Sequence, residues 1–520
     1  MTAEVEAVSP AELRSLPSCT LTPDQLGDLE LLLSGTYAPL TGFMTDADVA
    51  AVAASWQLAD GLPFPVPVTL DIPEAAVPTA PDGSPVTRML LADPEGTPLA
   101  VMTITERTAQ PDGNLRLAGP VFANRPPEHG PFRHLMLGPE ATRAQLGGGP
   151  VLAFATRAPL GNREIGQLRH LAGQLGAQIL VLPLVSGRAD VVGAPQALIR
   201  TLLAAMPTLP PRTLIVPVPF ARRRSAESRA RELAGVARIA AAYGATHLMA
   251  DRVPPGQVPA GAEFTASAVI PVLPSGDWAY DPRAEVWRPH SLIEAGTERE
   301  DLSADQLGDL LDSGGPIPSW VAPPAVAREL RRVRRPRSQR GIVLFLTGLS
   351  GSGKSTIARD LADVLAERGD RQVSLLDGDL VRQLLSAGLT FSRADRDLNI
   401  ARIGFVAAEI ARHGGIAICA PIAPFASARA EVRRMVSEVG DFFLVYVATP
   451  VEVCEARDRK GLYAKARAGV ISQFTGVSDP YEEPTDAELV IDTSAMSRQE
   501  AVAAVLKLLT SGGWLADETG

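Results

Sequence analysis

The sequence of 520 residues contains only three cysteines, Cys19, Cys419 and Cys454, and no two of them are close in the chain. So few cysteines argue against a disulfide framework or a zinc ribbon and are typical of a reducing compartment. The opening segment, 1–13, is acidic and lacks the apolar stretch of a signal peptide. No apolar run approaches the roughly 18 residues of a membrane-spanning helix. We therefore expect a cytoplasmic protein without a membrane partner.

Lysine is also scarce, and acidic residues outnumber basic ones, with 59 Asp and Glu against 49 Lys and Arg and a net charge of −10. An acidic chain is a poor candidate for non-specific binding of nucleic acid, so we expect no nucleic-acid partner. The basic cluster at 331–340 is interpreted as a solvated linker. A strip that contacts a nucleotide or another subunit is the alternative.

A complete glycine-rich phosphate-binding motif lies at Gly348–Ser355, which follows the pattern G-x-x-x-x-G-K-[ST]. The apolar run 342–346 predicts a buried strand before it, and helical spacing up to Gly369 predicts a helix after it. In this setting backbone N–H groups surround phosphate oxygens, and the helix N-terminus adds partial positive charge. Lys354 can reach the β- and γ-phosphates of a nucleoside triphosphate, and the Ser355 hydroxyl can ligate Mg²⁺. The alternative is a glycine-rich turn before an ordinary helix.

The remaining pattern predicts a multidomain α/β protein. Residues 1–145 have a mixed, strand-rich character, whereas 146–290 alternate strands with helices, which predicts a parallel sheet. Residues 291–340 are expected to form a helical closing segment and the basic linker, and 341–520 a parallel P-loop domain. Parallel sheets bind ligands at the carboxyl ends of their strands, so the loops at those ends are the expected sites.

Two polar stretches follow the phosphate-binding motif. A predicted strand ends in Asp377-Gly378-Asp379, where carboxylates can serve Mg²⁺ or an attacking hydroxyl; capping of the next helix is the alternative. The stretch 389–404 spaces arginines along a predicted helix start, which can present guanidinium groups to a phosphate or sulfate. An exposed charged helix face is the alternative.

Four motifs in this region occur in order: LDGD-x-x-R, DR-x-x-N-I-x-R-I-G, KGLY-x-x-AR-x-G and FTG-x-x-x-P-YE-x-P. With them, 341–500 resembles adenylyl-sulfate (APS) kinase. The resemblance implies transfer of the γ-phosphoryl group of ATP to the 3′-hydroxyl of adenosine 5′-phosphosulfate (APS), which gives PAPS. ATP and APS are then the small-molecule partners, with Mg²⁺ as the cofactor that accompanies ATP.

The resemblance also assigns roles to residues. Asp379 is the expected base or hydroxyl orienter, and Lys354 is the second catalytic residue. Phe391 and Phe474 would sandwich the APS adenine by stacking. The expected ATP-binding residues are Gly348, Ser350, Gly351, Ser352, Gly353, Lys354, Ser355 and Thr356. The expected APS-binding residues are Asp377, Arg382, Phe391, Arg396, Asn399, Ile422, Lys460 and Phe474.

One departure from the kinase pattern lies at 422–425, where the family often has I-S-P-Y and this chain has Ile422-Ala423-Pro424-Phe425. In some members that serine is linked to a phosphorylated form, which cannot arise here. Phosphoryl transfer needs only positioning and charge neutralisation, so an active kinase is still expected.

The front half is similar to ATP sulfurylase (sulfate adenylyltransferase). The segments TYAPLTGFM (36–44), YGATH (243–247) and 310–331 carry the similarity, which implies a PUA-like N-terminal domain and a Rossmann-like α/β domain. Both families commonly self-associate, so we expect a homo-oligomer, a dimer or higher.

The expected sulfurylase motif, Q-T-R-N-P-x-H-x-x-H, is degenerate at 155–164. Thr156, Arg157 and Pro159 remain, but the two histidines fall on Gly161 and Glu164, and the Gln and Asn positions hold alanines. The segment 251–256 lacks a further histidine of the family. Losing even one donor of this kind typically costs about 10²–10³ in rate, so we predict little or no sulfurylase activity and a structural or regulatory role for this region.

Three alternatives stay open at this point. Arg157, Arg222 and Arg223 could rebuild an anion site for another ligand. The chain could be a working bifunctional PAPS synthetase with both ATP sulfurylase and APS kinase activities. It could also be a non-enzymatic protein that only senses a nucleotide.

Overall fold

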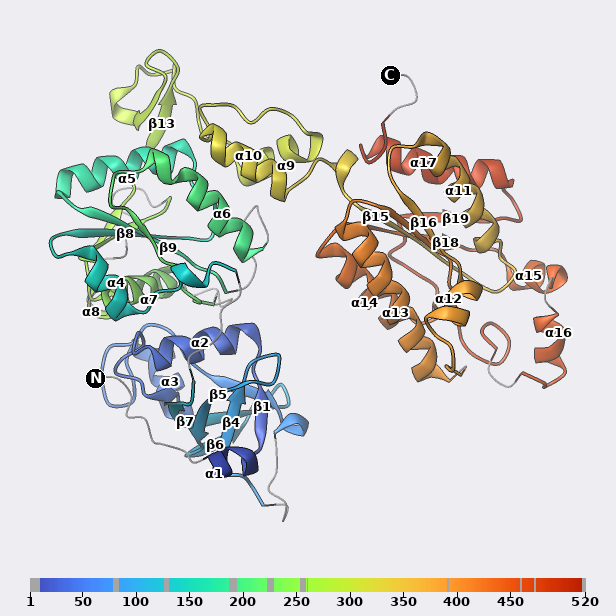
Figure 1. Ribbon diagram of the computed structural model, residues 1–520, viewed down its shortest axis with the longest axis horizontal. Helices are drawn as coiled ribbons and strands as arrows, with labels where there is room; N and C mark the ends of the chain where they lie inside the picture. The colour runs from blue at the N-terminus through green and yellow to red at the C-terminus, as the bar shows by residue number, and fades with distance from the viewer. Residues whose placement is uncertain are drawn as a thin grey trace. The chain divides into compact units, whose positions relative to one another are not determined.

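The computed structural model describes residues 10–77, 84–125, 131–186, 194–221, 229–252, 259, 261–390, 392–458, 461–471 and 474–516 (Figure 1). The chain forms two compact units, one of Met1–Leu310 with Pro316–Arg334 and one of Leu311–Gly315 with Arg335–Gly520. Within the described ranges, every helix is too short or too polar to cross a membrane.

The N-terminal part of the first unit is the expected mixed, strand-rich domain. Its seven-stranded sheet has the order β1-β4-β5-β7-β2, and β3 and β6 also pair with β7. The strands are β1 (Ser18–Thr20), β2 (Gly42–Phe43), β3 (Leu70–Pro73), β4 (Arg88–Ala92), β5 (Pro98–Thr103), β6 (Glu106–Ala109) and β7 (Asn114–Ala123). The helices are α1 (Pro10–Ser15), α2 (Pro23–Leu33) and α3 (Asp46–Ser55), with the 3₁₀ turns η1 (Glu74–Ala76) and η2 (Arg133–Leu135).

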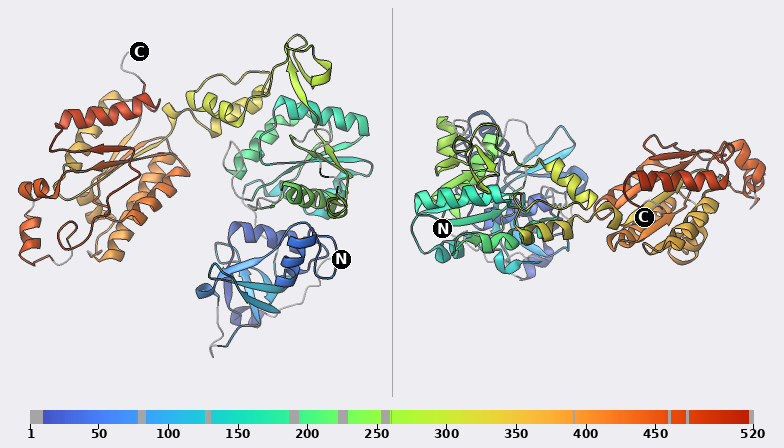
Figure 2. Two further views of the ribbon diagram at one scale, coloured as in Figure 1. Left: turned by 180° about the vertical axis from the view of Figure 1, so that it is seen from behind. Right: turned by 90° about the horizontal axis from the view of Figure 1, so that it is seen from above.

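The second part of this unit is a parallel five-stranded sheet with the order β10-β9-β8-β11-β12. Its strands are β8 (Val151–Thr156), β9 (Gln178–Pro183), β10 (Leu214–Ile215), β11 (His247–Ala250) and β12 (Val272–Pro274). The helices here are α4 (Pro139–Leu146), α5 (Asn162–Leu175), α6 (Pro195–Ala205), α7 (Arg229–Ala242) and α8 (Ala262–Ala268), with η3 (Met206–Thr208) after α6. In Figures 1 and 2, α5 and α6 cover one face of the sheet, and α4, α7 and α8 cover the other.

The closing segment follows this sheet. It is preceded by the antiparallel hairpin of β13 (Trp278–Asp281) and β14 (Val286–Pro289) and by η4 (His290–Leu292), and it contains α9 (Ala304–Ser313) and α10 (Pro324–Val333). The segment expected to be helical, 291–340, thus contains the helices α9 and α10.

Helix α2 of the N-terminal part packs directly on the carboxyl edge of the parallel sheet. A Cβ atom on Gly27 would lie 2.3 Å from the carbonyl oxygen of Pro219, so only glycine allows this approach. Ser186, which follows β9, donates a hydrogen bond to Asp24 at 2.7 Å. The carboxyl edge where ligands bind in parallel sheets is therefore in contact with α2.

The second unit is a parallel sheet with the order β16-β17-β15-β18-β19, as expected for a P-loop domain. Its strands are β15 (Ile342–Thr347), β16 (Val373–Leu376), β17 (Ile416–Cys419), β18 (Asp441–Val447) and β19 (Leu489–Ile491). The helices are α11 (Lys354–Arg368), α12 (Gly378–Leu384), α13 (Arg393–Arg412), α14 (Ala426–Ser437), α15 (Val451–Arg457), α16 (Leu462–Arg467) and α17 (Arg498–Ser511). Helices α11 and α17 cover one face of this sheet and α13 and α14 cover the other (Figure 1), and a cluster of buried apolar side chains lies under each pair.

The prediction of a solvated basic linker at 331–340 is wrong in part. Arg332 is exposed, but Arg337, in η5 (Arg337–Gln339), stacks on Trp514 at 4.9 Å and donates to the Gly512 carbonyl at 3.1 Å. Arg340 forms an ion pair with Asp312, within the five residues 311–315 that belong to the second unit. The end of the linker is therefore bound to the kinase-like unit by stacking and ion pairs.

Candidate functional site

The phosphate-binding loop starts at the end of β15, whose residues are all buried. The loop contains three glycines with positive φ, a backbone conformation that residues with a side chain rarely adopt. The φ values are 148° at Gly348, 78° at Gly351 and 103° at Gly353. A Cβ atom on Gly348 would lie 2.4 Å from the Val447 carbonyl oxygen, and a Cβ atom on Gly351 would lie 2.9 Å from the Cys454 carbonyl oxygen. The glycines therefore permit both the backbone path and the close packing around it.

Hydroxyl groups from three other segments hold the loop from outside. Thr449 and Thr493 donate to the Ser352 carbonyl at 3.0 and 2.9 Å, and the Tyr463 hydroxyl donates to the Ser350 carbonyl at 2.9 Å. These bonds fix the carbonyl groups, so the loop conformation is set by the protein itself. Such preorganisation is what a phosphate cradle requires.

The motif lysine and hydroxyl residues lie where the sequence predicted, in the first turn of α11. Lys354 is 6% exposed, and its ammonium donates to the Leu349 carbonyl at 2.7 Å and lies 3.4 Å from Ser352 Oγ. Ser355 and Thr356 follow it in the same turn. Among the described residues no cluster of three or more His, Cys, Asp or Glu could hold a metal, and a Mg²⁺ bound with ATP needs only one or two protein ligands. A hydroxyl oxygen is a ligand type that Mg²⁺ accepts, and the role of Ser355 as that ligand stays a prediction.

The parallel topology brings the other predicted stretches to the same edge. Asp377 follows β16 and pairs with Arg359 at 3.3 Å, and Asp379 and Arg382 lie in α12 directly after it. The side chains of Asp379 and Arg382 lie outside the part that the structure describes. The predicted roles of Phe391 and Lys460 concern residues that are also outside the described ranges.

Helix α13 contributes two buried polar residues one turn apart. Its start is capped by the Ser392 hydroxyl, which accepts from the Asp395 amide at 3.2 Å. Arg396 and Asn399, spaced by three residues on one helix face, are 8% and 7% exposed. Asn399 Oδ1 is buried and has no hydrogen-bond partner among the described residues. A buried acceptor without a donor is costly unless a ligand supplies one.

The aromatic loop after α16 reaches the same region. Phe474 is 8% exposed and packs edge-on against Tyr463 at 5.0 Å and 77°. Ile422 belongs to the segment that departs from I-S-P-Y, and its carbonyl accepts a hydrogen bond from Thr347. Phe425 in that segment is buried, and the Arg393 guanidinium lies over its ring at 4.2 Å.

The predicted sulfurylase residues occupy the carboxyl end of β8 in the first unit. The Arg157 guanidinium is buried and donates to the carbonyls of Ser186 at 3.0 Å and Phe220 at 2.7 Å. It also lies 3.8 Å from Glu232. Thr156 binds its own turn, because its hydroxyl donates to the Ala158 carbonyl at 2.8 Å. The alternative that joined Arg157 to Arg222 and Arg223 rests on two residues outside the described ranges.

Glu164 caps the helix that follows. Its carboxylate accepts from the Gly161 amide at 3.0 Å, so it satisfies an N-terminal N–H group of α5. A Cβ atom on Gly161 would lie 2.9 Å from both this carboxylate and the Val321 carbonyl oxygen. A histidine at 161 therefore does not fit this backbone without a shift.

The same carboxylate joins a partly buried cluster of charges. Arg163 pairs with Glu164, with Asp301 at 3.5 Å and with Asp251 at 3.7 Å, and Arg252 also approaches Glu164 and Asp301. Burial raises the pKa of both Asp251 and Asp301, and the Glu164 carboxylate raises each pKa further. Three carboxylates thus face two guanidinium groups, which is unfavourable for the phosphates of a nucleotide.

Family models match along the chain: PUA-like domain at residues 2–151, ATP-sulfurylase at 133–333 and Adenylylsulphate kinase at 340–492. The "Sulfate adenylyltransferase" of Phaeosphaeria nodorum is 36% identical over 555 residues, which cover 97% of this chain and 95% of that protein. The protein of the same name from Emericella nidulans is 37% identical over 557 residues, with the same coverage. The chain belongs to the sulfate adenylyltransferase family.

Within this family the chain carries an adenylylsulphate kinase domain at its C-terminal end, and the predicted PUA-like, sulfurylase-type and P-loop folds are confirmed. The solved "Hexameric APS kinase from Thiobacillus denitrificans" matches with a TM-score of 0.78 and 35% identity, and covers 97% of this chain and 95% of that chain. The names of the sulfate adenylyltransferase relatives do not support the predicted loss of sulfurylase activity.

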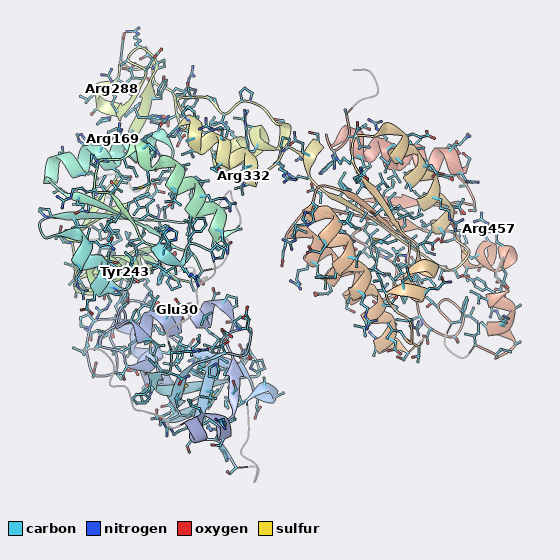
Figure 3. All side chains as sticks on the ribbon, viewed as in Figure 1. Glu30, Arg169, Tyr243, Arg288, Arg332 and Arg457 are labelled. Atoms are coloured by element: carbon cyan, nitrogen blue, oxygen red, sulfur yellow. The ribbon has the colours of Figure 1, made fainter. Side chains whose placement is uncertain are left out.

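Several residues around the phosphate-binding loop were not predicted. Tyr463 and Asp479 lie inside the KGLY and FTG-x-x-x-P motifs, so the motifs mark them without giving their roles. Thr449 and Thr493 have no sequence signal at all. Arg457 at the end of α15, labelled in Figure 3, donates to Thr493 at 2.7 Å and approaches the Gly351 carbonyl at 3.5 Å.

Proposed function

We propose that this chain transfers the γ-phosphoryl group of ATP to the 3′-hydroxyl of APS and so produces PAPS. The observation that carries the proposal is the buried polar face of α13 on the unit that holds the phosphate-binding loop. There Arg396 can bind an anionic group of APS, and Asn399 Oδ1, which no described residue donates to, can accept a hydrogen bond from an APS donor.

The donor half of the reaction rests on the loop. Its amides and the start of α11 bind the ATP phosphates, and Lys354 moves from the Leu349 carbonyl to neutralise charge on the transferred group. Mg²⁺, held with ATP and ligated by Ser355, would supply further charge neutralisation when bound. Asp379, from its place in α12, would orient the 3′-hydroxyl and accept its proton.

The acceptor half depends on shape as well as charge. Phe474 offers a ring for stacking on the adenine of APS, and Tyr463 supports that ring from its edge. Arg396, which is bonded to Thr475 and Asp479 of the same loop, would bind the anionic group, so base and anion are held by different side chains. The similarity to a full-length relative that is described as hexameric supports a homo-oligomer.

A coupled assay tests this function. With ATP, Mg²⁺ and APS, the full chain should release ADP and form PAPS, and Lys354→Ala should lower the rate by at least about 10²-fold, because it removes charge stabilisation in the transition state. Lys507→Ala changes an exposed lysine on α17 and serves as the control. No PAPS from the wild-type chain would leave only nucleotide binding and refute the proposal.

A second candidate function is the two-step production of PAPS, in which the first unit makes APS from ATP and sulfate. The names of whole-length relatives favour it over an inactive first unit. The local geometry weighs against it, because Arg157 is bound to backbone carbonyls and Glu164 caps α5.

The reverse sulfurylase reaction separates these two functions. Lys354→Ala protein, in which the consumption of APS by the kinase step should be slowed at least about 10²-fold, is mixed with APS and pyrophosphate, and ATP formation is followed by luminescence. ATP at enzymic turnover assigns both activities to the chain. A signal no higher than that of a boiled sample assigns the kinase activity alone.

A further inference from the structure

An acidic residue that no motif assigned lies beside the substrate-binding arginine of the second unit. Asp479 forms an ion pair with Arg396, and the two side chains are 22% and 10% exposed. The other terminal nitrogen of Arg396 donates to the Thr475 hydroxyl at 3.2 Å. A guanidinium group has five N–H donors, so it can keep these partners and bind a ligand as well.

Asp479 also closes the turn that carries the stacking ring. The Phe474 carbonyl accepts from the amides of Val477, Ser478 and Asp479 at 3.1, 3.0 and 3.0 Å. The Gly476 amide donates to the Asp479 carbonyl at 2.8 Å, and the Phe474 amide donates to the Ser478 hydroxyl at 2.8 Å. Residues 474–479, here named the FTGVSD turn, are therefore one closely bonded element.

The FTGVSD turn is held at both of its ends. At one end the Asp479 carboxylate ties it to α13 through Arg396. At the other end Phe474 packs on Tyr463, whose hydroxyl is bonded to the phosphate-binding loop at Ser350. A shift of the turn thus moves the stacking ring relative to both substrate-binding elements.

We propose that Asp479 is a positioning residue for APS, which sets the orientation of Arg396 and at the same time fixes Phe474. The proposal rests on the kinase function proposed above. The role is cooperative rather than competitive, because the turn binds Arg396 through both Asp479 and Thr475. An anion that displaced Asp479 would release the turn at the moment when its ring is needed for the adenine.

The substitution Asp479→Asn tests this role because it keeps the shape of the side chain and removes its charge. The KM for APS should rise by roughly tenfold or more, as expected for a lost charge-assisted hydrogen bond, while the KM for ATP changes by less than about twofold. Asp479→Glu should restore part of the affinity. In a Phe474→Ala background the same change should have a smaller effect, because part of it acts through the ring.

The matched control is Asp486→Asn, a change of the same kind a few residues later. Asp486 pairs with Arg433 at 3.4 Å and is 61% exposed, so both KM values should stay unchanged. The thermal unfolding temperature of each variant, measured on the full chain, separates a positioning effect from a loss of fold.

Three outcomes would overturn the role. A lower KM for APS in Asp479→Asn would make the carboxylate a competitor of the substrate. Equal increases in both KM values with a lower unfolding temperature would make it a support of the fold, and unchanged values would give it no role. If the wild-type chain makes no PAPS, the proposed function fails, and calorimetric binding of APS to wild type and Asp479→Asn still decides the role of Asp479.

Discussion

Replacing Asn399 with leucine tests whether the buried face of α13 is built for a ligand or for the fold. The residue is 7% exposed, and its Oδ1 atom has no hydrogen-bond partner among the described residues. An unsatisfied buried polar group costs about 1–3 kcal/mol. Leucine has a similar volume and no polar atom, so the variant should be more stable without ligand by about 1 kcal/mol or more.

The same substitution should weaken the binding of APS. Asn399 Oδ1 can no longer accept a hydrogen bond from the amino group of the adenine or a hydroxyl of the ribose. A lost hydrogen bond in a buried site corresponds to about 1–3 kcal/mol, or roughly 5- to 150-fold in the KM for APS. Stability and affinity should therefore change in opposite directions.

Scanning calorimetry of the full chain measures the first effect. The transition of the second unit is the one that a non-hydrolysable ATP analogue shifts upward. A gain of 1 kcal/mol raises the midpoint by about 2–4 °C for a domain of about 150–250 residues. Gln372→Leu, which removes an exposed amide from the same unit, is the control for the assay.

The reasoning is refuted if Asn399→Leu lowers the midpoint temperature of the second unit's transition and leaves the KM for APS unchanged. That result would mean that Oδ1 holds the fold through a partner within the protein. A lower midpoint temperature together with a higher KM for APS would also refute it, because the prediction is a gain in stability together with a loss of affinity.

Three further predictions concern other parts of the chain. Phe474→Ala should raise the KM for APS by roughly 5- to 150-fold, because stacking on a base is worth about 1–3 kcal/mol, and it should change the KM for ATP far less. Phe405→Ala, which changes a 62% exposed ring, is the control. Equal increases in both KM values would contradict the assignment. Gly351→Ala should abolish the rise in unfolding temperature caused by ATP, since the new Cβ would lie 2.9 Å from the Cys454 carbonyl oxygen; Gly369→Ala, with open space at its Cβ, should keep that rise. Burial raises the pKa of Glu30 on α2 from 4.5 to about 7 (Figure 3). The folded protein therefore holds this proton more tightly than the unfolded chain does. The resulting contribution to the free energy of unfolding is fully present below pH 4.5 and is lost as the pH rises through about 7. Between about pH 5 and pH 8 the free energy of unfolding of Glu30→Gln should therefore rise relative to that of the wild type by on the order of 1–3 kcal/mol. Urea unfolding measures both free energies, and a difference that stays constant with pH would disprove the prediction.

The sequence was most informative where local pattern decides structure. The apolar run before Gly348 and the helical spacing after it predict β15 and α11, because a phosphate-binding loop needs both. Strand β10 ends at Ile215, because Pro217 and Pro219, shortly after it, have no N–H group for a sheet. The local pattern does not reveal strand β7, because Gly119, with a φ of 141°, and Pro120 interrupt its apolar residues.

The candidate site was predictable only in its contiguous motifs. Lys354 and Ser355 follow from the loop, and Arg396 and Asn399 share a face because they are spaced by three on a helix. The partner of Arg396 is Asp479, which lies 83 positions further along the chain, so no local pattern reveals the pair. For Glu164 the sequence shows only that a carboxylate stands where the family motif has a histidine. The structure adds that this charge caps α5 and pairs with Arg163.

The ion pair between Asp312 and Arg340 has a consequence for how this polypeptide could be divided, whether by a protease or by gene fission. A cut within the basic stretch before Ile342 would release a kinase-like fragment whose linker has lost its carboxylate partner, because Asp312 precedes the cut. No single cut divides the polypeptide cleanly, because residues 311–315 belong to the second unit whereas the later residues 316–334, with α10, belong to the first.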